Sequence, residues 1–148
     1  MTIAIGSDHA GFALKEAVKA HLEEKGVAIE DFGTYNADSV DYVSYAKAVC
    51  GAVKDGSCEK GLLFCGTGIG MSMAANKIHG IRAAACSDYF SAKATRQHND
   101  ANVLCLGERV VGPGLAFALV DVFLETAYEG GERHIRRLNQ VMELENDY

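Results

Sequence analysis

The 148-residue sequence contains no tryptophan and a single proline, Pro113, and it has no Ser- or Pro-rich stretch. No linker between domains is therefore indicated, and we expect one domain over residues 1–148, a length that can bury a sizeable core. No apolar run approaches the roughly 20 residues that a membrane-spanning helix needs. The first residues lack the charged-then-apolar layout of a signal peptide, so we expect a cytoplasmic protein.

Basic residues and paired cysteines are also scarce. Lys and Arg number 14 against 20 Asp and Glu, a formal net charge of −6. This balance argues against nucleic acid or an anionic membrane as the main partner, because phosphate backbones need clustered Lys and Arg. The five cysteines form no C-x-x-C pair, which excludes a thioredoxin-like motif and a zinc ribbon. The content of 49% hydrophobic and 23% charged residues is that of an ordinary globular protein.

Short apolar runs alternate with longer amphipathic stretches along the chain. The runs are mostly continuous in apolarity, which is typical of strands buried on both faces. A helix after each strand predicts an α/β fold, in which helices cover both faces of a parallel sheet. The expected strands cover residues 3–5, 27–32, 61–64, 81–86 and 102–106, and the expected helices cover residues 12–25, 42–53, 70–77, 88–97, 115–127 and 133–145.

A glycine-rich turn, Cys65–Gly70, follows the third expected strand. Ligands of open parallel sheets bind beyond the carboxyl ends of the strands, so this turn falls where an active site is expected. Its three glycines in five residues allow backbone N–H groups to converge on an anion, helped by the helix that follows. The same position favours the thiolate form of Cys65. The alternative is a tight turn beside an unreactive core cysteine.

Three known motifs nearly fit this turn and fail. The dinucleotide fingerprint needs glycine where Met71 stands, and a cysteine phosphatase loop needs arginine there. No P-loop run exists. A redox-sensing thiol would need a resolving cysteine, but the nearest in sequence, Cys58, is expected at the other end of the strand. The turn is therefore interpreted as an oxyanion cradle.

Two further polar motifs contain histidine. Asp8 and His9 follow the first strand and supply an acceptor and a titrating donor, or else a helix cap and a loop histidine. His98 and Asn99 are expected in a polar turn at the opposite edge of the sheet, where Arg96 and His98 are alternatively favourable cations at a helix end. Two histidines without polar neighbours are interpreted as structural, His21 and His79.

The densest basic cluster begins at Arg133. Arg133 and Arg137 are four residues apart and share one helix face, which suits a phosphate clamp. The alternative is a solvated face paired with Glu129 or Glu132. Arg109, just after the fifth strand, is a third candidate for an anion site.

Six motifs occur in order along the whole chain: Gly6–Gly11, Asp41–Tyr42, Cys65–Gly70 with Ala74–Lys77, Arg96–Asn102, Gly107–Gly112 and Tyr128–Gly131. Their order and spacing resemble the type B ribose-5-phosphate isomerases, a family that also contains galactose-6-phosphate and allose-6-phosphate isomerases.

The resemblance implies a Rossmann-like three-layer α/β/α sandwich with a five-stranded parallel sheet. It implies a homodimer or homotetramer with shared active sites, whose C-terminal helix packs on a partner subunit. The implied reaction interconverts ribose 5-phosphate and ribulose 5-phosphate in the pentose phosphate pathway, through an enediolate, without a metal or cofactor. The alternatives are an allose- or galactose-6-phosphate isomerase, or a non-catalytic partner subunit of such an enzyme.

The resemblance also implies roles for single residues. Cys65 is the general base that moves a proton between C2 and C1, and Thr67 and His98 help to open the sugar ring. The implied substrate-binding residues are Asp8 and Asn99 for the sugar hydroxyls, His9, Arg109, Arg133 and Arg137 for the phosphate, Tyr42 in the pocket wall, and Gly66, Gly68, Ile69 and Gly70 for the oxyanion.

The chain departs from the family pattern at three positions. Members with a carboxylate base carry Glu where Met71 stands, which places this chain with the cysteine type. Many members have proline where Val43 stands. Glu132 interrupts the usual Gly-Gly-Arg-His run, so Arg133 and Arg137 are matched across a one-residue insertion.

Overall fold

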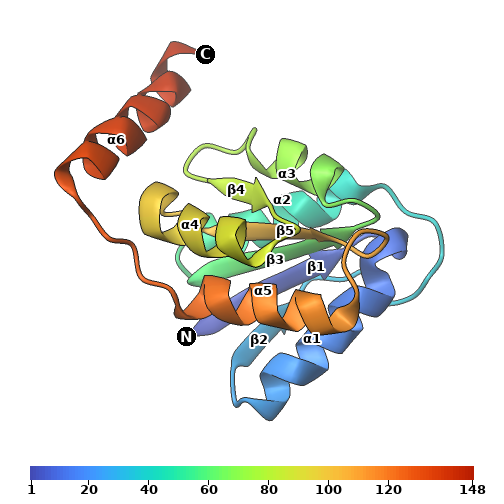
Figure 1. The fold of residues 1–148 in the computed structure, drawn as a ribbon. Coiled ribbons are helices and arrows are strands. Elements are labelled where there is room, and N and C mark those ends of the chain that lie inside the picture. The colour runs from blue at the N-terminus through green and yellow to red at the C-terminus, as the bar shows by residue number, and fades with distance from the viewer.

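A computed structural model describes all 148 residues of the chain. Its five strands form one parallel sheet in the order β2-β1-β3-β5-β4 (Figure 1). The strands are β1 (Thr2–Ser7), β2 (Ala28–Asp31), β3 (Lys60–Cys65), β4 (Ala83–Ala85) and β5 (Val103–Gly107). The helices are the short 3₁₀ turn η1 (His9–Gly11), α1 (Phe12–Glu24), α2 (Tyr42–Lys54), α3 (Ile69–Ala75), α4 (Tyr89–Asn99), α5 (Pro113–Glu125) and α6 (Glu132–Asp147).

Helices cover both faces of the sheet, as the sequence predicts. Successive side chains of a strand point to opposite faces, so Leu62 and Phe64 of β3 pack under α1 and α5, whereas Leu63 packs under α2 and α3. Both groups are fully buried. The continuous apolar runs of the sequence therefore serve two hydrophobic cores, one on each side of the sheet.

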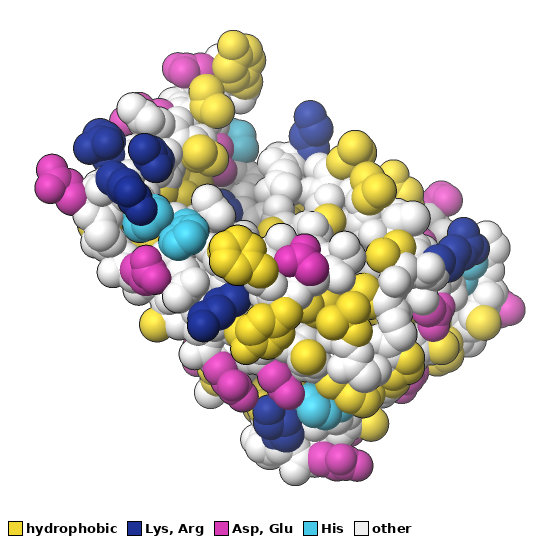
Figure 2. Space-filling view, viewed as in Figure 1, with side chains coloured by type: hydrophobic (Ala, Val, Ile, Leu, Met, Phe, Trp, Pro, Cys, Tyr) yellow, Lys and Arg dark blue, Asp and Glu magenta, His cyan; other side chains and the backbone are white.

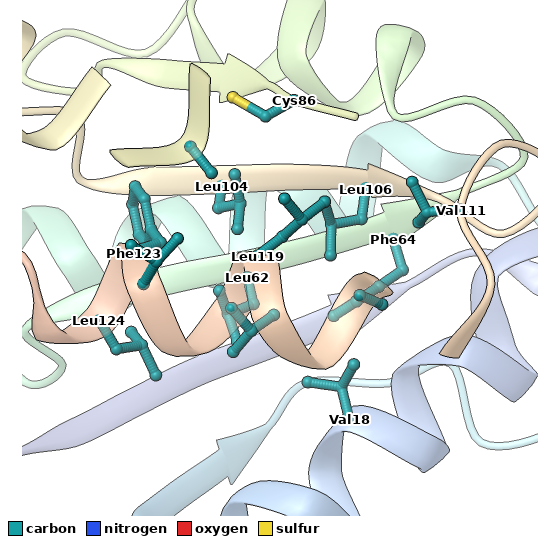
Figure 3. Packing of buried hydrophobic residues seen from close by; sticks show 14 of the residues in the cluster. Val18, Leu62, Phe64, Cys86, Leu104, Leu106, Val111, Leu119, Phe123 and Leu124 are labelled. Carbon is teal, nitrogen blue, oxygen red and sulfur yellow. The ribbon is translucent and has the colours of Figure 1, made fainter. Parts of the chain in front are cut away.

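The core beneath α5 shows how one helix covers several strands. Leu119 and Phe123 of α5 point at the sheet and meet Leu62 of β3 and Leu104 of β5 (Figure 3). All four side chains are fully buried, and a buried side chain of this size contributes about 1.5–3 kcal/mol to folding. This packing holds α5 against β3 and β5.

The carboxyl ends of the five strands all lie on the same side of the sheet because all strands run in the same direction. Backbone pairing aligns Ser7 of β1 with Phe64 of β3, and Cys65 with Gly107 of β5. The polar turns that follow β1, β3 and β5 are therefore neighbours. This arrangement sets the location of the candidate site.

Helix α6 differs from the other helices because none of its residues is buried. It extends away from the sheet (Figure 1), and among the helices it contacts α4. Its inner side is nevertheless apolar, with Leu138, Val141 and Leu144 at helical spacing beside a groove of about 1030 Å³. Such a stripe on a helix normally packs against another surface.

The structure corrects two sequence interpretations. His98 and Asn99 lie in the last turn of α4 rather than in a polar turn, because α4 continues until Asp100 adopts a left-handed conformation with φ of 47°. His21 remains a structural residue, but it has a polar partner: its Nε2 lies 2.9 Å from Oδ1 of Asp121 and links α1 to α5. None of the helices combines the length and apolarity needed to cross a bilayer.

Candidate active site

Cys65 ends β3 and faces the glycine-rich turn. Its side chain is buried, and its Sγ accepts a hydrogen bond from the backbone N–H of Gly68 at 3.0 Å. Gly68 can make this bond because it adopts φ of 78°, a conformation that glycine reaches without strain. This bond holds the Cys65 side chain against the turn.

The other four cysteines have a different environment. Burial raises the pKa of Cys50 to about 12 and the pKa values of Cys58 and Cys86 to about 11. Burial also raises the pKa of Cys105 well above its usual value. These thiols stay neutral near pH 7, which leaves Cys65 as the cysteine with a backbone donor at its sulfur.

The turn after Cys65 is packed closely on three sides. A Cβ on Gly107 would lie 2.5 Å from the carbonyl carbon of Thr67, and a Cβ on Gly70 would lie 2.9 Å from Cζ of Tyr42. The guanidinium carbon of Arg109 would lie 3.6 Å from a Cβ on Gly66. The structure thus brings Tyr42 and Arg109 to the turn and packs its backbone closely on these sides.

Helix α3 begins at this turn with Gly68 as its N-cap residue, which has no side chain to accept a hydrogen bond. The first N–H groups of a helix have no partner within the helix, and here the hydroxyl of Thr67 accepts one of them, from Ile69, at 3.3 Å. Both Thr67 and Ile69 are exposed. The turn therefore presents the hydroxyl of Thr67 to solvent close to Cys65.

Asp8 and His9 lie at the end of the neighbouring strand. Oδ1 of Asp8 accepts hydrogen bonds from the N–H groups of Ala10 at 2.9 Å and Gly11 at 3.0 Å, so the cap interpretation of Asp8 is confirmed for η1. Nδ1 of His9 accepts from the N–H of Val40 at 3.1 Å. Because a backbone N–H only donates, Nδ1 is the acceptor nitrogen of this ring, and this bond holds the orientation of the imidazole.

Glu108 joins this region from the turn after β5, and sequence reasoning missed it. Its Oε1 accepts a hydrogen bond at 2.9 Å from the N–H of Leu14, in the first turn of α1. The backbone N–H of Glu108 donates to the carbonyl oxygen of Cys65 at 2.9 Å. Glu108 thereby ties the Cys65 turn to the helix that follows Asp8 and His9. No local sequence signal marks a contact between residues 94 positions apart.

A second group of the expected residues lies elsewhere on the chain. His98, Asn99 and Arg137 line the groove beside α6. The rings of His98 and His134 are stacked, with centroids 4.6 Å apart and an angle of 5° between planes. Arg133 lies in the same turn of α6 and lines an adjoining cavity of about 490 Å³. Figure 2 shows basic side chains gathered beside histidines over the first part of α6.

Burial and positively charged neighbours both act on this second group. Partial burial lowers the pKa of His134, and the neighbouring His98, Arg133 and Arg137 lower it further against the opposing effect of Glu129. From the sequence, His134 is not a candidate site residue, and Glu129 is only an alternative partner for the arginines of this helix face. They become neighbours of His98 only through the packing of α4 against the segment that precedes α6.

Within one chain, the two groups lie at opposite ends of the parallel strands. His98 is close in sequence to Val103, where β5 begins, whereas Cys65 is aligned with Gly107, where β5 ends. Four residues of strand span about 13 Å. The structure therefore brings Asp8, His9, Tyr42, Thr67 and Arg109 to the Cys65 turn, but it does not bring His98, Asn99, Arg133 or Arg137 there.

Known proteins are similar to this chain over nearly its whole length. The pattern of the ribose/galactose isomerase family matches residues 3–141. Ribose-5-phosphate isomerase B of Escherichia coli (strain K12) is 50% identical over 143 residues, which are 97% of this chain and 95% of that protein.

Two solved structures have the same fold over their full length. The structure of Clostridium thermocellum ribose-5-phosphate isomerase B matches with a TM-score of 0.98 and 48% identity, covering 100% of this chain and 99% of that one. The Thermotoga maritima ribose 5-phosphate isomerase matches with a TM-score of 0.94 and 51% identity, covering 96% and 97%. The chain therefore belongs to the ribose/galactose isomerase family.

Proposed function

We propose that this protein is a metal-independent aldose–ketose isomerase that interconverts ribose 5-phosphate and ribulose 5-phosphate. The observation that carries the proposal is the Cys65 turn, where a buried sulfur accepts a backbone N–H beside further donors. The relatives named for ribose-5-phosphate isomerase activity match over nearly their whole length, which supports the choice of substrate.

Proton transfer is assigned to Cys65. The Cys65 thiolate takes the proton from C2 of the open-chain aldose, and the C2–H electrons form a C1=C2 double bond as negative charge moves to O1. The resulting enediolate is stabilised by N–H groups of the turn from Gly66 to Gly70. Sγ then returns its proton to C1, and the proton of O2 is transferred to O1, so that C2=O2 becomes the ketose carbonyl and O1 becomes a hydroxyl.

The remaining side chains bind and orient the sugar phosphate. Thr67 and His98 assist opening of the furanose ring by moving protons at the ring oxygen and the anomeric hydroxyl. Asp8 and Asn99 bind sugar hydroxyls, and Tyr42 forms a wall of the pocket. The phosphate is held by His9, Arg109, Arg133 and Arg137. The binding energy of these contacts orients C1 and C2 relative to Cys65.

We further propose that the complete site is formed by two copies of the chain. Within one copy, His98 and Arg137 lie near the beginning of β5, whereas Cys65 lies at its end. A site that contains all three residues therefore takes His98 and Arg137 from another copy. The uncovered apolar side of α6 supports the same arrangement, since a second copy packed on it would cover that side. The smallest such assembly is a homodimer with two shared sites.

Turnover of ribose 5-phosphate to ribulose 5-phosphate, measured with EDTA present and with allose 6-phosphate run in parallel, tests the function. We expect EDTA-resistant conversion of the pentose. Faster conversion of the hexose would keep the chemistry and change the substrate. A folded protein that converts neither sugar would contradict the proposal and indicate a non-catalytic partner subunit.

A further inference from the structure

Three side chains with metal-binding atoms converge at the junction of α4 and α6. They are His98 in the last turn of α4, Glu129 in the segment before α6, and His134 in the first turn of α6. One potential ligand atom from each residue lies within 4.8 Å of the other two. Oε2 of Glu129 is 4.0 Å from Nε2 of His98 and 3.9 Å from Nε2 of His134.

The backbone around this cluster is fixed by several contacts. The N–H of Glu129 donates to the carbonyl oxygen of Gln97 at 3.1 Å. The buried Arg96 donates through Nε to the carbonyl oxygen of Thr126 at 3.2 Å. The segment that carries Glu129 is thus attached to the end of α4 at two points. The three side chains therefore approach one another because of the packed backbone.

Two imidazoles and one carboxylate are a donor set that Zn²⁺ prefers, with a fourth position open to water. Ligand atoms around a tetrahedral zinc ion lie about 3.4 Å apart, given metal–ligand distances of about 2.0–2.1 Å. The two distances from Glu129 to the histidines, 3.9 and 4.0 Å, exceed this by about half an ångström, and the ligand atoms of His98 and His134 lie within 4.8 Å of each other. His98 and Glu129 are 42% and 48% exposed, so small side-chain rotations can close the gap.

The surrounding charge decides which metals suit the cluster. Arg133 and Arg136 line the cavity next to Glu129 and His134, and their positive charge disfavours a cation held by electrostatic attraction alone. Metals that form strong bonds to imidazole, such as Zn²⁺, Ni²⁺ and Cu²⁺, overcome this repulsion, whereas Mg²⁺ and Ca²⁺ prefer oxygen ligands.

We propose that His98, Glu129 and His134 form a binding site for a divalent transition metal of the zinc class, and that metal bound there inhibits the enzyme. The inhibition rests on the proposed function, in which His98 moves a proton during ring opening. A metal bound to Nε2 of His98 would occupy the lone pair that this step uses. It would also hold the imidazole of His98 against Glu129 and His134 of the same subunit, away from the sugar bound next to Cys65 of the other copy.

Metal binding is tested on the full-length protein after EDTA treatment and desalting. Co²⁺ is titrated while its visible absorption is followed, and Zn²⁺ is then added as a competitor. We expect one metal per chain, with affinity reduced more than about tenfold in both His134→Asn and Glu129→Gln, because even indirect partners of a metal site contribute about 10–100-fold.

Two control variants separate this site from other ligands. His79→Asn removes an exposed histidine outside the cluster, and Cys65→Ser removes the thiol of the glycine turn. Both should bind Co²⁺ with the affinity of the parent protein. Unchanged binding in His134→Asn and Glu129→Gln would overturn the site, as would loss of binding in Cys65→Ser.

Inhibition is measured in parallel, relative to the metal-free rate of each variant. Zn²⁺ should inhibit the parent protein reversibly, Mg²⁺ should not, and His134→Asn should have lost zinc sensitivity. Metal bound at the cluster with undiminished turnover would overturn the inhibitory role. Metal bound by a protein without any isomerase activity would contradict the proposed function and support the site, whereas normal turnover without metal binding would overturn the site alone.

Discussion

The sulfur of Cys65 and the backbone nitrogen of Gly68 are joined by a hydrogen bond of 3.0 Å across the turn that ends β3. This contact holds the side chain of the proposed base in one orientation. The other cysteines are buried neutral thiols, so the same substitution should have different consequences at different cysteine positions.

Cys65→Ala should lower kcat by about 10²–10⁴-fold, the usual contribution of a general base. KM should change little, because proton transfer occurs only on the path to the transition state. Cys86→Ala is the matched control, since it also removes a buried thiol but one outside the site, and it should retain turnover. Steady-state kinetics with ribose 5-phosphate measures both, and near-normal turnover by Cys65→Ala would show that another group is the base.

The proposed sharing of sites between copies predicts complementation. Cys65→Ala and His98→Asn should each be inactive as purified homodimers. After the two are mixed, unfolded and refolded together, each mixed dimer contains one site with both residues intact. Activity should then return to about a quarter of the parent level, because half of the dimers are mixed and half of their sites are intact. Mixtures that stay inactive, although mixed dimers form, would place His98 and Cys65 in separate functions.

Arg137 and Arg136 are neighbours in α6 with different surroundings. Arg137 lines the groove with His98 and Asn99, whereas Arg136 lines the adjoining cavity. Arg137→Ala should raise KM about tenfold or more with a smaller effect on kcat, since a hydrogen bond to a charged group contributes about 1.5–3 kcal/mol. Arg136→Ala should leave KM near the parent value. Equal effects of the two substitutions would indicate general surface charge rather than a phosphate contact.

Lys15 and Asp31 form a buried ion pair, with Nζ 2.8 Å from Oδ1 and the Lys15 side chain fully buried. Burial alone would raise the pKa of Asp31, but hydrogen bonds from Lys15, the N–H of Gly33 and Lys19 outweigh it and hold the pKa below its usual value. Asp31→Asn leaves Lys15 without this partner, and the free energy of unfolding at pH 7 should fall by about 3 kcal/mol.

The pH dependence of this effect has a defined sign. The pKa of Asp31 is lowered in the folded state, so its stabilisation is complete above the unfolded pKa of about 3.9 and is lost as pH falls through the lower folded value. Urea unfolding at fixed protein concentration should therefore show the parent and Asp31→Asn converging below about pH 4. A difference that stays constant down to pH 2 would assign the cost to packing instead of charge.

Much of the fold was predictable because local patterns specify it. The apolar run at Leu62–Phe64 indicates a strand buried on both faces, and the spacing of apolar residues after Phe12 indicates a helix. The Cys65 turn was predictable for the same reason, since its cysteine and glycines are consecutive. Sequence patterns shorter than about ten residues thus indicate both the layers of the fold and the Cys65 turn.

The rest depends on contacts between distant segments. The sequence pattern predicts the end of α4 two residues early, because the left-handed Asp100 is held by Arg96, whose Nη1 lies 2.7 Å from Oδ1, and by Arg82, which directly precedes β4. The contact of Glu129 and His134 with His98 likewise joins residues more than thirty positions apart. No periodicity or spacing in the sequence indicates such tertiary contacts.

Gly107 and Gly114 give a last prediction, in which the same substitution has opposite effects. A Cβ on Gly107 would lie 2.5 Å from the backbone of Thr67, whereas a Cβ on Gly114 would meet nothing within 4 Å. Gly107→Ala should destabilise the protein by about 1–3 kcal/mol through overpacking and lower kcat by displacing the turn.

Gly114→Ala should instead stabilise α5 by up to about 1 kcal/mol, because Gly114 lies in the first turn of the helix and alanine loses less conformational freedom on folding. Thermal unfolding and turnover of the two variants are compared at the same protein concentration. If Gly107→Ala kept the parent's melting temperature and kcat, the close approach of β5 to the Cys65 turn would not be what holds the proposed base in place.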